Sequence, residues 1–225
     1  MKKQIILLTC SRKYGANCVA GVDYKTSEWI RIIDNHNTSG SLTASQMVYP
    51  DGTPWEILDV VEVKFKDDYV APSYQPENLH IDTKAPVKKI GRVTWDYVLK
   101  LGLEWTADDS ILHCPKGDIR NTKYQVSKMD SPRSLQFLPV NDLSIRKTFV
   151  ECSDGYIKTK IYAEFEYRGH RYTNVSITDP TYNSNTVSGT HNIGPAHLIV
   201  SRGLPWTHPI SRIDWHYTIL AKVIA

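Results

Sequence analysis

The sharpest catalytic pattern in the chain is the segment LHCPKGDIRN at residues 112–121. It places a histidine directly before Cys114 and Arg120 six positions after it, which is the H-C-x5-R spacing of cysteine-dependent phosphatases. In such a site the thiolate attacks phosphorus, while backbone N–H groups and a bidentate arginine hold the phosphate oxygens. The spacing makes a phosphatase one hypothesis for this chain, with Cys114 and Arg120 as its catalytic residues.

That chemistry requires the loop to join a strand to the N-terminus of a helix, because the helix dipole lowers the pKa of the thiol. The residues after Arg120, NTKYQVSKMDSP, make a poor amphipathic helix that ends at Pro132. The chain also lacks the alternating strands and helices that are typical of this class of enzyme. We therefore expect a binding protein without catalytic residues or a cofactor, and we keep the phosphatase as a less favoured alternative.

Metal binding is a second chemical possibility, because cysteine and histidine are ligands that zinc prefers. The four cysteines have no paired CxxC spacing, and the eight histidines show no HExxH or HxH pattern. The residues considered as ligands are Cys10, Cys18, His113, Cys114 and Cys152. Their irregular spacing predicts no metal site, and it indicates reduced thiols in a cytosolic protein.

A different chemistry is spread along the chain, where cationic or amide side chains stand beside aromatic rings. Segments of this kind are SRKYG, EWIRI, YQPEN, YRGHRY and VSRGLPW. Rings can stack on the bases of single-stranded nucleic acid while arginine and lysine contact its phosphates. The candidate binding residues are Ser11, Arg12, Lys13, Tyr14, Trp29, Arg31, Gln75, Asn78, Arg171, Tyr172 and Arg202, with Trp206 as a further candidate for stacking. The competing interpretation is that the rings are core and the charges lie on solvated strand edges.

The composition is that of an ordinary folded protein with a mild basic excess. The chain has 225 residues, of which 41% are hydrophobic and 23% charged, and its net charge is +3. A charge of this size is compatible with a polyanionic partner but does not require one. The apolar run near the N-terminus is too short for a signal peptide, and no apolar segment approaches the length of a membrane span. We expect a cytoplasmic protein without membrane association.

Short β-rich runs bounded by Gly, Pro, Asn and Asp predict an all-β chain with minor helices. The clearest hairpin joins KIYAEFEY to RYTNVSI through RGH, and the clearest helix is TWDYVLKLGLEW, which Thr94 can cap. Two β-rich halves beside a helical stretch indicate paired small barrels, with a single sandwich as the main rival. The expected boundaries are 1–90 for the first barrel, 91–132 for a helical connector and 133–225 for the second barrel.

Recurring landmarks extend from residue 7 to the C-terminus. They are TCSRKYGANCVAGVD, EWIRII, the DG of YPDGTPW, ILDVVEV, YQPENLHID, RSLQFLPV, ITDP and HLIVSRGLPW…YTILAKVIA. In this order they resemble the dual OB-containing domain family, a prokaryotic group named for two consecutive OB folds. The sequence departs from the family pattern at Ala16, Asn17, Ser27 and Ile32.

The resemblance implies two OB-like barrels and, through the fold, binding of nucleic acid, and it supplies no catalytic residues. We therefore expect a non-catalytic module that binds nucleic acid, with single-stranded DNA or RNA favoured, in a prokaryotic system whose other proteins are further partners. The alternative is a protein- or nucleotide-binding interaction module, because OB barrels also bind peptides and nucleotides.

Overall fold

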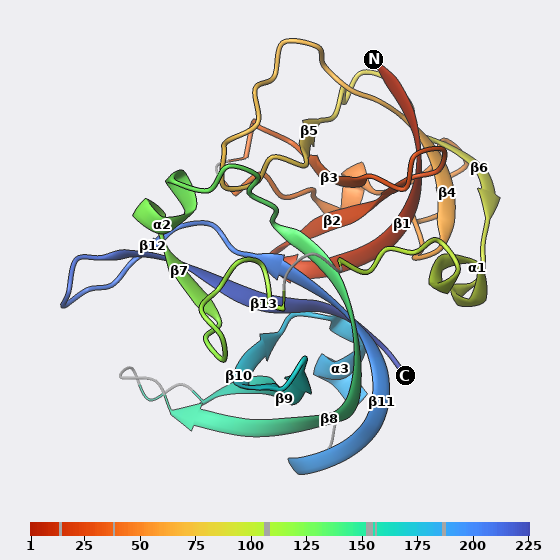
Figure 1. Cartoon of the computed structure of the whole chain (residues 1–225). Coiled ribbons are helices and arrows are strands. Elements are labelled where there is room, and N and C mark those ends of the chain that lie inside the picture. The colour runs from red at the N-terminus through yellow and green to blue at the C-terminus, as the bar shows by residue number, and fades with distance from the viewer. Residues whose placement is uncertain (14, 38, 106–108, 152–154, 156, 186–187) are drawn as a thin grey trace. The chain divides into compact units, whose positions relative to one another are not determined.

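The computed structural model describes residues 1–13, 15–37, 39–105, 109–151, 155, 157–185 and 188–225. The described chain divides into two units, Met1–Leu103 and Glu104–Ala225. Each unit has its own β-sheet (Figure 1). Each unit also has its own hydrophobic core. The prediction of a mostly β chain with two consecutive barrels is confirmed. The boundaries proposed for a helical connector over 91–132 stay a prediction.

The first unit, over its described residues, is built on six strands. They are β1 (Lys2–Lys13), β2 (Ala16–Asp23), β3 (Trp29–Ile33), β4 (Asp59–Lys64), β5 (Asn78–His80) and β6 (Lys88–Arg92). Their order in the sheet is β5-β3-β2-β1-β4-β6, with β3 and β5 parallel and the other neighbours antiparallel. Phe65, directly after β4, forms a bridge with Ile81, directly after β5. This bridge joins the β5 edge of the sheet to the end of β4, next to the other edge strand β6, as in a small closed barrel.

Alternation along the strands sets the core of the first unit. On β3, Ile30 and Ile32 pack into the core, so Arg31 between them lies on the opposite face. Where β1 pairs with β2, a Cβ atom added to Gly21 would lie only 1.9 Å from the carbonyl oxygen of Ile6. Glycine at this position therefore allows the close approach of two strands.

Helices are short in the first unit. They are η1 (Ala44–Gln46) and α1 (Trp95–Leu99). As predicted, Thr94 caps α1 by accepting a hydrogen bond from the amide of Tyr97. The helix is shorter than the sequence pattern suggests, because Gly102, with φ +66°, turns the chain away after one further turn. Among the described residues of either unit, no helix has the length and apolar character needed to cross a membrane.

The described residues of the second unit form seven strands and two short helices. They are β7 (Arg120–Thr122), α2 (Lys123–Ser127), β8 (Leu135–Glu151), β9 (Ile157–Tyr167), β10 (His170–Ile177), α3 (Pro180–Asn185), β11 (Gly189–Arg202), β12 (Trp206–Thr207) and β13 (Asp214–Ile224). The order β10-β9-β8-β11-β13 closes into a ring because the end of β10 pairs in parallel with β13. The predicted hairpin is β9–β10, and its turn places Arg168 and Gly169 at positive φ, as a primed turn requires.

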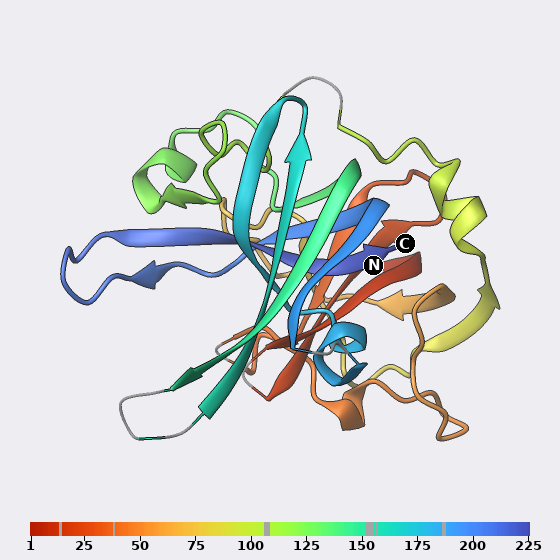
Figure 2. The same cartoon turned by 90° about the horizontal axis from the view of Figure 1, so that it is seen from below.

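Strand β13 has two roles in the second unit. Its later residues belong to the ring, where they pair with β10 and β11. Its first residues pair instead with β12 on one side and β7 on the other. In Figure 2 the blue ribbon of β12 and the start of β13 extends away from the ring. This extension presents a small three-stranded sheet, β7-β13-β12.

Candidate nucleic-acid interface

Three predicted binding residues of the first unit form a buried polar network. Arg31 on β3 and Asn78 on β5 are register partners, and Arg31 Nη1 donates to Asn78 Oδ1 at 3.0 Å. Asn78 Nδ2 in turn donates to Gln75 Oε1 at 3.2 Å. All three side chains are buried. The segments EWIRI and YQPEN thus meet in space, and these contacts tie β3 to the segment that leads into β5.

The remaining candidates of the first unit have different exposures. Ser11 is buried on β1 opposite Cys18, Arg12 is exposed, and Trp29 is half-buried at the start of β3. The side chain of Lys13 and the whole of Tyr14 lie outside the described residues. Within this group, Arg12 is therefore the described side chain that offers an exposed positive charge. Ligand contact by these residues stays a prediction.

The candidates of the second unit are not gathered on one surface. Tyr172 is fully buried and its ring stacks on Phe165, with the centroids 5.8 Å apart, so no base can reach it in the folded barrel. Arg202 is also buried, and its Nη2 donates to the carbonyl oxygen of Leu112. Arg171 is exposed but forms ion pairs with carboxylates on both sides, at Asp142 and Glu164. Tyr172 therefore belongs to the core.

The cysteine of the H-C-x5-R segment lies in the wrong environment for a phosphatase. Cys114 is 3% exposed, its S–H donates to Asn121 Oδ1 at 3.2 Å, and Thr218 Oγ1 lies 3.5 Å from its sulfur. Burial raises the pKa of the Cys114 thiol to about 11, so the thiol is protonated at neutral pH. Arg120 begins strand β7 rather than a helix that could bind phosphate at its N-terminus. These facts do not favour the phosphatase alternative, which stays a hypothesis with Cys114 and Arg120 as its catalytic residues.

The small sheet β7-β13-β12 carries three aromatic side chains, of which Trp206 is exposed and Trp215 and Tyr217 are half-buried. Along DWHYT, Trp215 and Tyr217 alternate with the buried His216, so both rings lie on one face of β13. Trp206 on β12 pairs with Trp215, and Arg120 on β7 pairs with Tyr217. Directly paired residues share a face of a sheet. The aromatic platform, defined as Arg120, Trp206, Trp215 and Tyr217, therefore occupies one face.

The rings and the cation of the aromatic platform are in contact. The Arg120 guanidinium lies over Trp215, with Cζ 4.7 Å from the ring centroid. The centroids of Trp206 and Tyr217 are 6.1 Å apart in an edge-to-face arrangement. Trp206 is 46% exposed, so much of its ring is open to solvent. The platform combines an exposed ring for stacking with an adjacent positive charge.

The opposite face of β13 anchors the platform. His216 is buried, and its Nδ1 lies 2.9 Å from the carbonyl oxygen of Gly203. Burial lowers the pKa of His216, which keeps the ring neutral at pH 7. This contact holds β13 against the segment between β11 and β12. The platform residues thus project from a fixed strand rather than from a free loop.

Helix α2 extends the cationic and aromatic surface beside the platform. It follows β7 directly, and Thr122 and Gln125 form a capping box at its start. Tyr124 is 71% exposed, and Lys128 Nζ lies 5.6 Å from its ring centroid. Lys123 is exposed as well, with Asp214 Oδ2 at 3.7 Å. The surface is therefore mixed in charge, and its rings are its most distinctive feature.

Comparison with known proteins establishes the family. The model of the dual OB-containing domain family matches residues 3–223, so the chain belongs to this family and the resemblance noted in its motifs is confirmed. No curated protein matches the chain significantly.

Two solved structures align with the chain along nearly their full lengths. One is a murine DNA binding protein bound with double-stranded DNA, with a TM-score of 0.34, 10% identity, and coverage of 100% of this chain and 98% of that one. The other is the tetrameric p202 HIN2, with a TM-score of 0.31, 9% identity, and coverage of 100% and 92%. Similarity at these TM-scores is too weak to support an argument about this chain.

Proposed function

We propose that this protein binds single-stranded nucleic acid through the aromatic platform of its second unit and catalyses no reaction of its own. The observation that carries the proposal is the exposed Trp206 beside the stacked pair of Arg120 and Trp215 on one face of a sheet. Proteins that bind single strands use such rings as stacking surfaces for successive bases. Membership of a family with two OB-containing domains supports this proposal, because OB folds are a common scaffold for binding oligonucleotides.

A single strand suits the platform better than a duplex does. In a duplex the faces of the bases are already stacked on one another, whereas an unpaired base can be placed on a protein ring. The platform has one cation, Arg120, and Asp118 Oδ1 lies 3.5 Å from its Nε. Strong binding to phosphates alone is therefore not expected. We expect stacking to supply most of the affinity and the salt dependence to be shallow, with a slope of about −0.7 for each phosphate contacted.

The same proposal includes the cellular context of the protein. The family resemblance supports a role in a prokaryotic system, with other proteins of that system as further partners. Free thiols at Cys18 and Cys114 are consistent with the reducing conditions of a cytoplasm. DNA and RNA both present base faces, so both are ligands to be compared.

Binding of a labelled single-stranded oligonucleotide of about 15 nucleotides, a length within the range bound by OB folds, tests the proposal by fluorescence anisotropy. Trp206→Ala removes the exposed ring, and loss of one stacked base, worth about 1–3 kcal/mol, should raise Kd about five- to 150-fold. Phe149→Ala is the matched control, since Phe149 is a 58% exposed ring on β8 of the same unit. It should leave Kd unchanged.

The same titration with the complementary duplex gives the second comparison. The parent should bind the duplex more weakly than the single strand. Failure of the parent to bind a single strand at low salt would defeat the proposal. So would equal affinities of the parent, Trp206→Ala and Arg120→Ala proteins, because the platform would then have no part in binding.

A further inference from the structure

We propose that Asp34, His36 and His80 of the first unit form a binding site for a divalent metal ion of the zinc type. The three side chains each offer one ligand atom, and these atoms lie within 4.8 Å of one another. Two imidazole nitrogens and one carboxylate oxygen are a donor set that suits zinc and neighbouring transition metals better than magnesium or calcium. The site is separate from the aromatic platform and does not depend on it.

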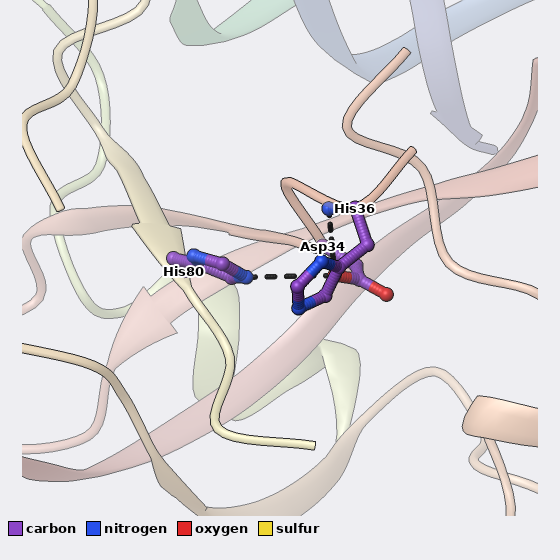
Figure 3. A group of neighbouring side chains, drawn as sticks. All are labelled: Asp34, His36 and His80. Carbon is purple, nitrogen blue, oxygen red and sulfur yellow. Dashed lines mark hydrogen bonds and ion pairs between the residues drawn. The ribbon is translucent and has the colours of Figure 1, made fainter. Parts of the chain in front are cut away.

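Parallel pairing of β3 and β5 brings the ligands together. Ile33, the last residue of β3, is the register partner of His80, the last residue of β5. Asp34 and His36 follow β3 directly in the chain. Because parallel strands end at the same edge of a sheet, residues 44 positions or more apart in sequence meet there. Figure 3 shows both imidazole rings beside the Asp34 carboxylate at this edge.

The distance between the two buried ligands fits a shared cation. His80 Nε2 and Asp34 Oδ1 lie 3.4 Å apart, and both side chains are buried. Metal–ligand distances of about 2.0–2.1 Å in a tetrahedral zinc site place neighbouring ligand atoms about 3.3 Å apart. The amide of Asn35 donates to His80 Nε2 at 3.2 Å, so a metal ion would take the single lone pair of this nitrogen in place of that hydrogen bond. A metal ion placed there would bind both electron-pair donors.

A second layer of contacts orients the carboxylate. Gln46 Nε2 donates to Asp34 Oδ2 at 2.6 Å. The Gln46 amide is itself held by the amide of Thr43, which donates to Gln46 Oε1 at 2.8 Å. Tyr69 packs edge-on against the His80 ring, with centroids 5.7 Å apart. Metal sites commonly hold their ligands through such outer contacts, and here they leave Asp34 Oδ1 directed at His80.

His36 is the adjustable ligand of the site. It is exposed, its ring centroid lies 5.7 Å from that of His80, and its amide donates to Asp34 Oδ1 at 3.1 Å. A small rotation of an exposed ring costs little and would complete a set of three protein ligands. Lys66 Nζ, 3.4 Å from His36 Nε2, competes for this ring. Three protein ligands leave a fourth position for water, which is the arrangement of an open zinc site.

Zinc binding by the full chain tests this inference through isothermal titration with Zn²⁺, beside the same titration with Mg²⁺. We expect one Zn²⁺ per chain and no measurable Mg²⁺ binding at this site. His36→Ala removes an exposed ligand and should raise Kd for zinc about 100-fold or more, since even outer contacts of metal sites are worth about 10–100-fold. His170→Ala, a half-exposed histidine of the other unit, is the matched control and should bind zinc like the parent.

Thermal melting distinguishes a loss of zinc binding from a loss of folding in the variant. Without zinc, the parent and His36→Ala proteins should melt at the same temperature, and zinc should raise the melting temperature of the parent alone. Absence of zinc binding by the parent at micromolar metal would overturn the inference. Equal zinc affinity of the parent and a normally folded His36→Ala protein would overturn it as well.

Discussion

Trp206 and Tyr172 are both aromatic residues of the second unit, and their surroundings give them different roles. Trp206 is 46% exposed at the edge strand β12, whereas Tyr172 is fully buried against Phe165. The sequence shows both rings beside arginines in similar segments, YRGHRY and SRGLPW. The two segments look alike in sequence, and only the pairing of their strands distinguishes the exposed Trp206 from the core residue Tyr172. Strand pairing likewise places Arg31, a predicted ligand contact, in a buried network with Asn78.

Cys114 provides a test at the residue scale. Because burial raises the pKa of its thiol to about 11, the reactive thiolate is scarce at pH 8 and becomes abundant only as the pH approaches that value. We expect iodoacetamide at pH 8 to modify Cys10 and Cys18, which are partly exposed, well before Cys114 in the native protein. Mass spectrometry of peptides from timed samples measures the three rates. Rapid modification of Cys114 at pH 7 would contradict the assignment of a protonated, buried thiol.

Strand pairing explains both candidate sites at the scale of elements. The aromatic platform exists because β13 continues beyond the closed ring and pairs there with β7 and β12. The proposed metal site exists because β3 and β5 run parallel and end together. Neither pairing follows from local patterns. Periodicity predicted the β9–β10 hairpin and the capping of α1 by Thr94, since these depend on residues close in sequence.

Gly21 tests the close approach of the paired strands β1 and β2. Gly21→Ala places a methyl group 1.9 Å from the Ile6 carbonyl oxygen, so one strand must move. Overpacking of this kind should lower the free energy of unfolding by about 1–3 kcal/mol or more, measured by urea denaturation. Gly91→Ala on β6 is the matched control, because nothing lies within 4 Å of its added Cβ. Equal destabilisation by both changes would show that the close approach is not the cause.

The whole molecule is a member of the dual OB-containing domain family with a separate barrel in each unit. Motif order and β-rich composition were sufficient to predict this architecture. The candidate site was predicted only in part. Trp206 and Arg120 were singled out, the latter for a different chemistry, whereas Trp215 and Tyr217 were missed although their alternation in DWHYT signals a shared face.

The sequence alone did not predict the proposed metal site. Asp34 and His36 are close in the chain, but His80 reaches them only through the parallel pairing of β3 and β5. The spacing of the eight histidines therefore predicted no metal site. Long-range pairing decides which side chains meet, and a single sequence does not encode it in any local period.

Photo-crosslinking with a single-stranded oligonucleotide that contains 5-iodouracil tests the central claim most directly. This base forms crosslinks with aromatic side chains on which it stacks, and mass spectrometry then identifies the crosslinked residue. The account predicts crosslinks at Trp206 or at its neighbour Tyr217 in the second unit. Crosslinks confined to the first unit, at Trp29 for example, with none on the platform would contradict it.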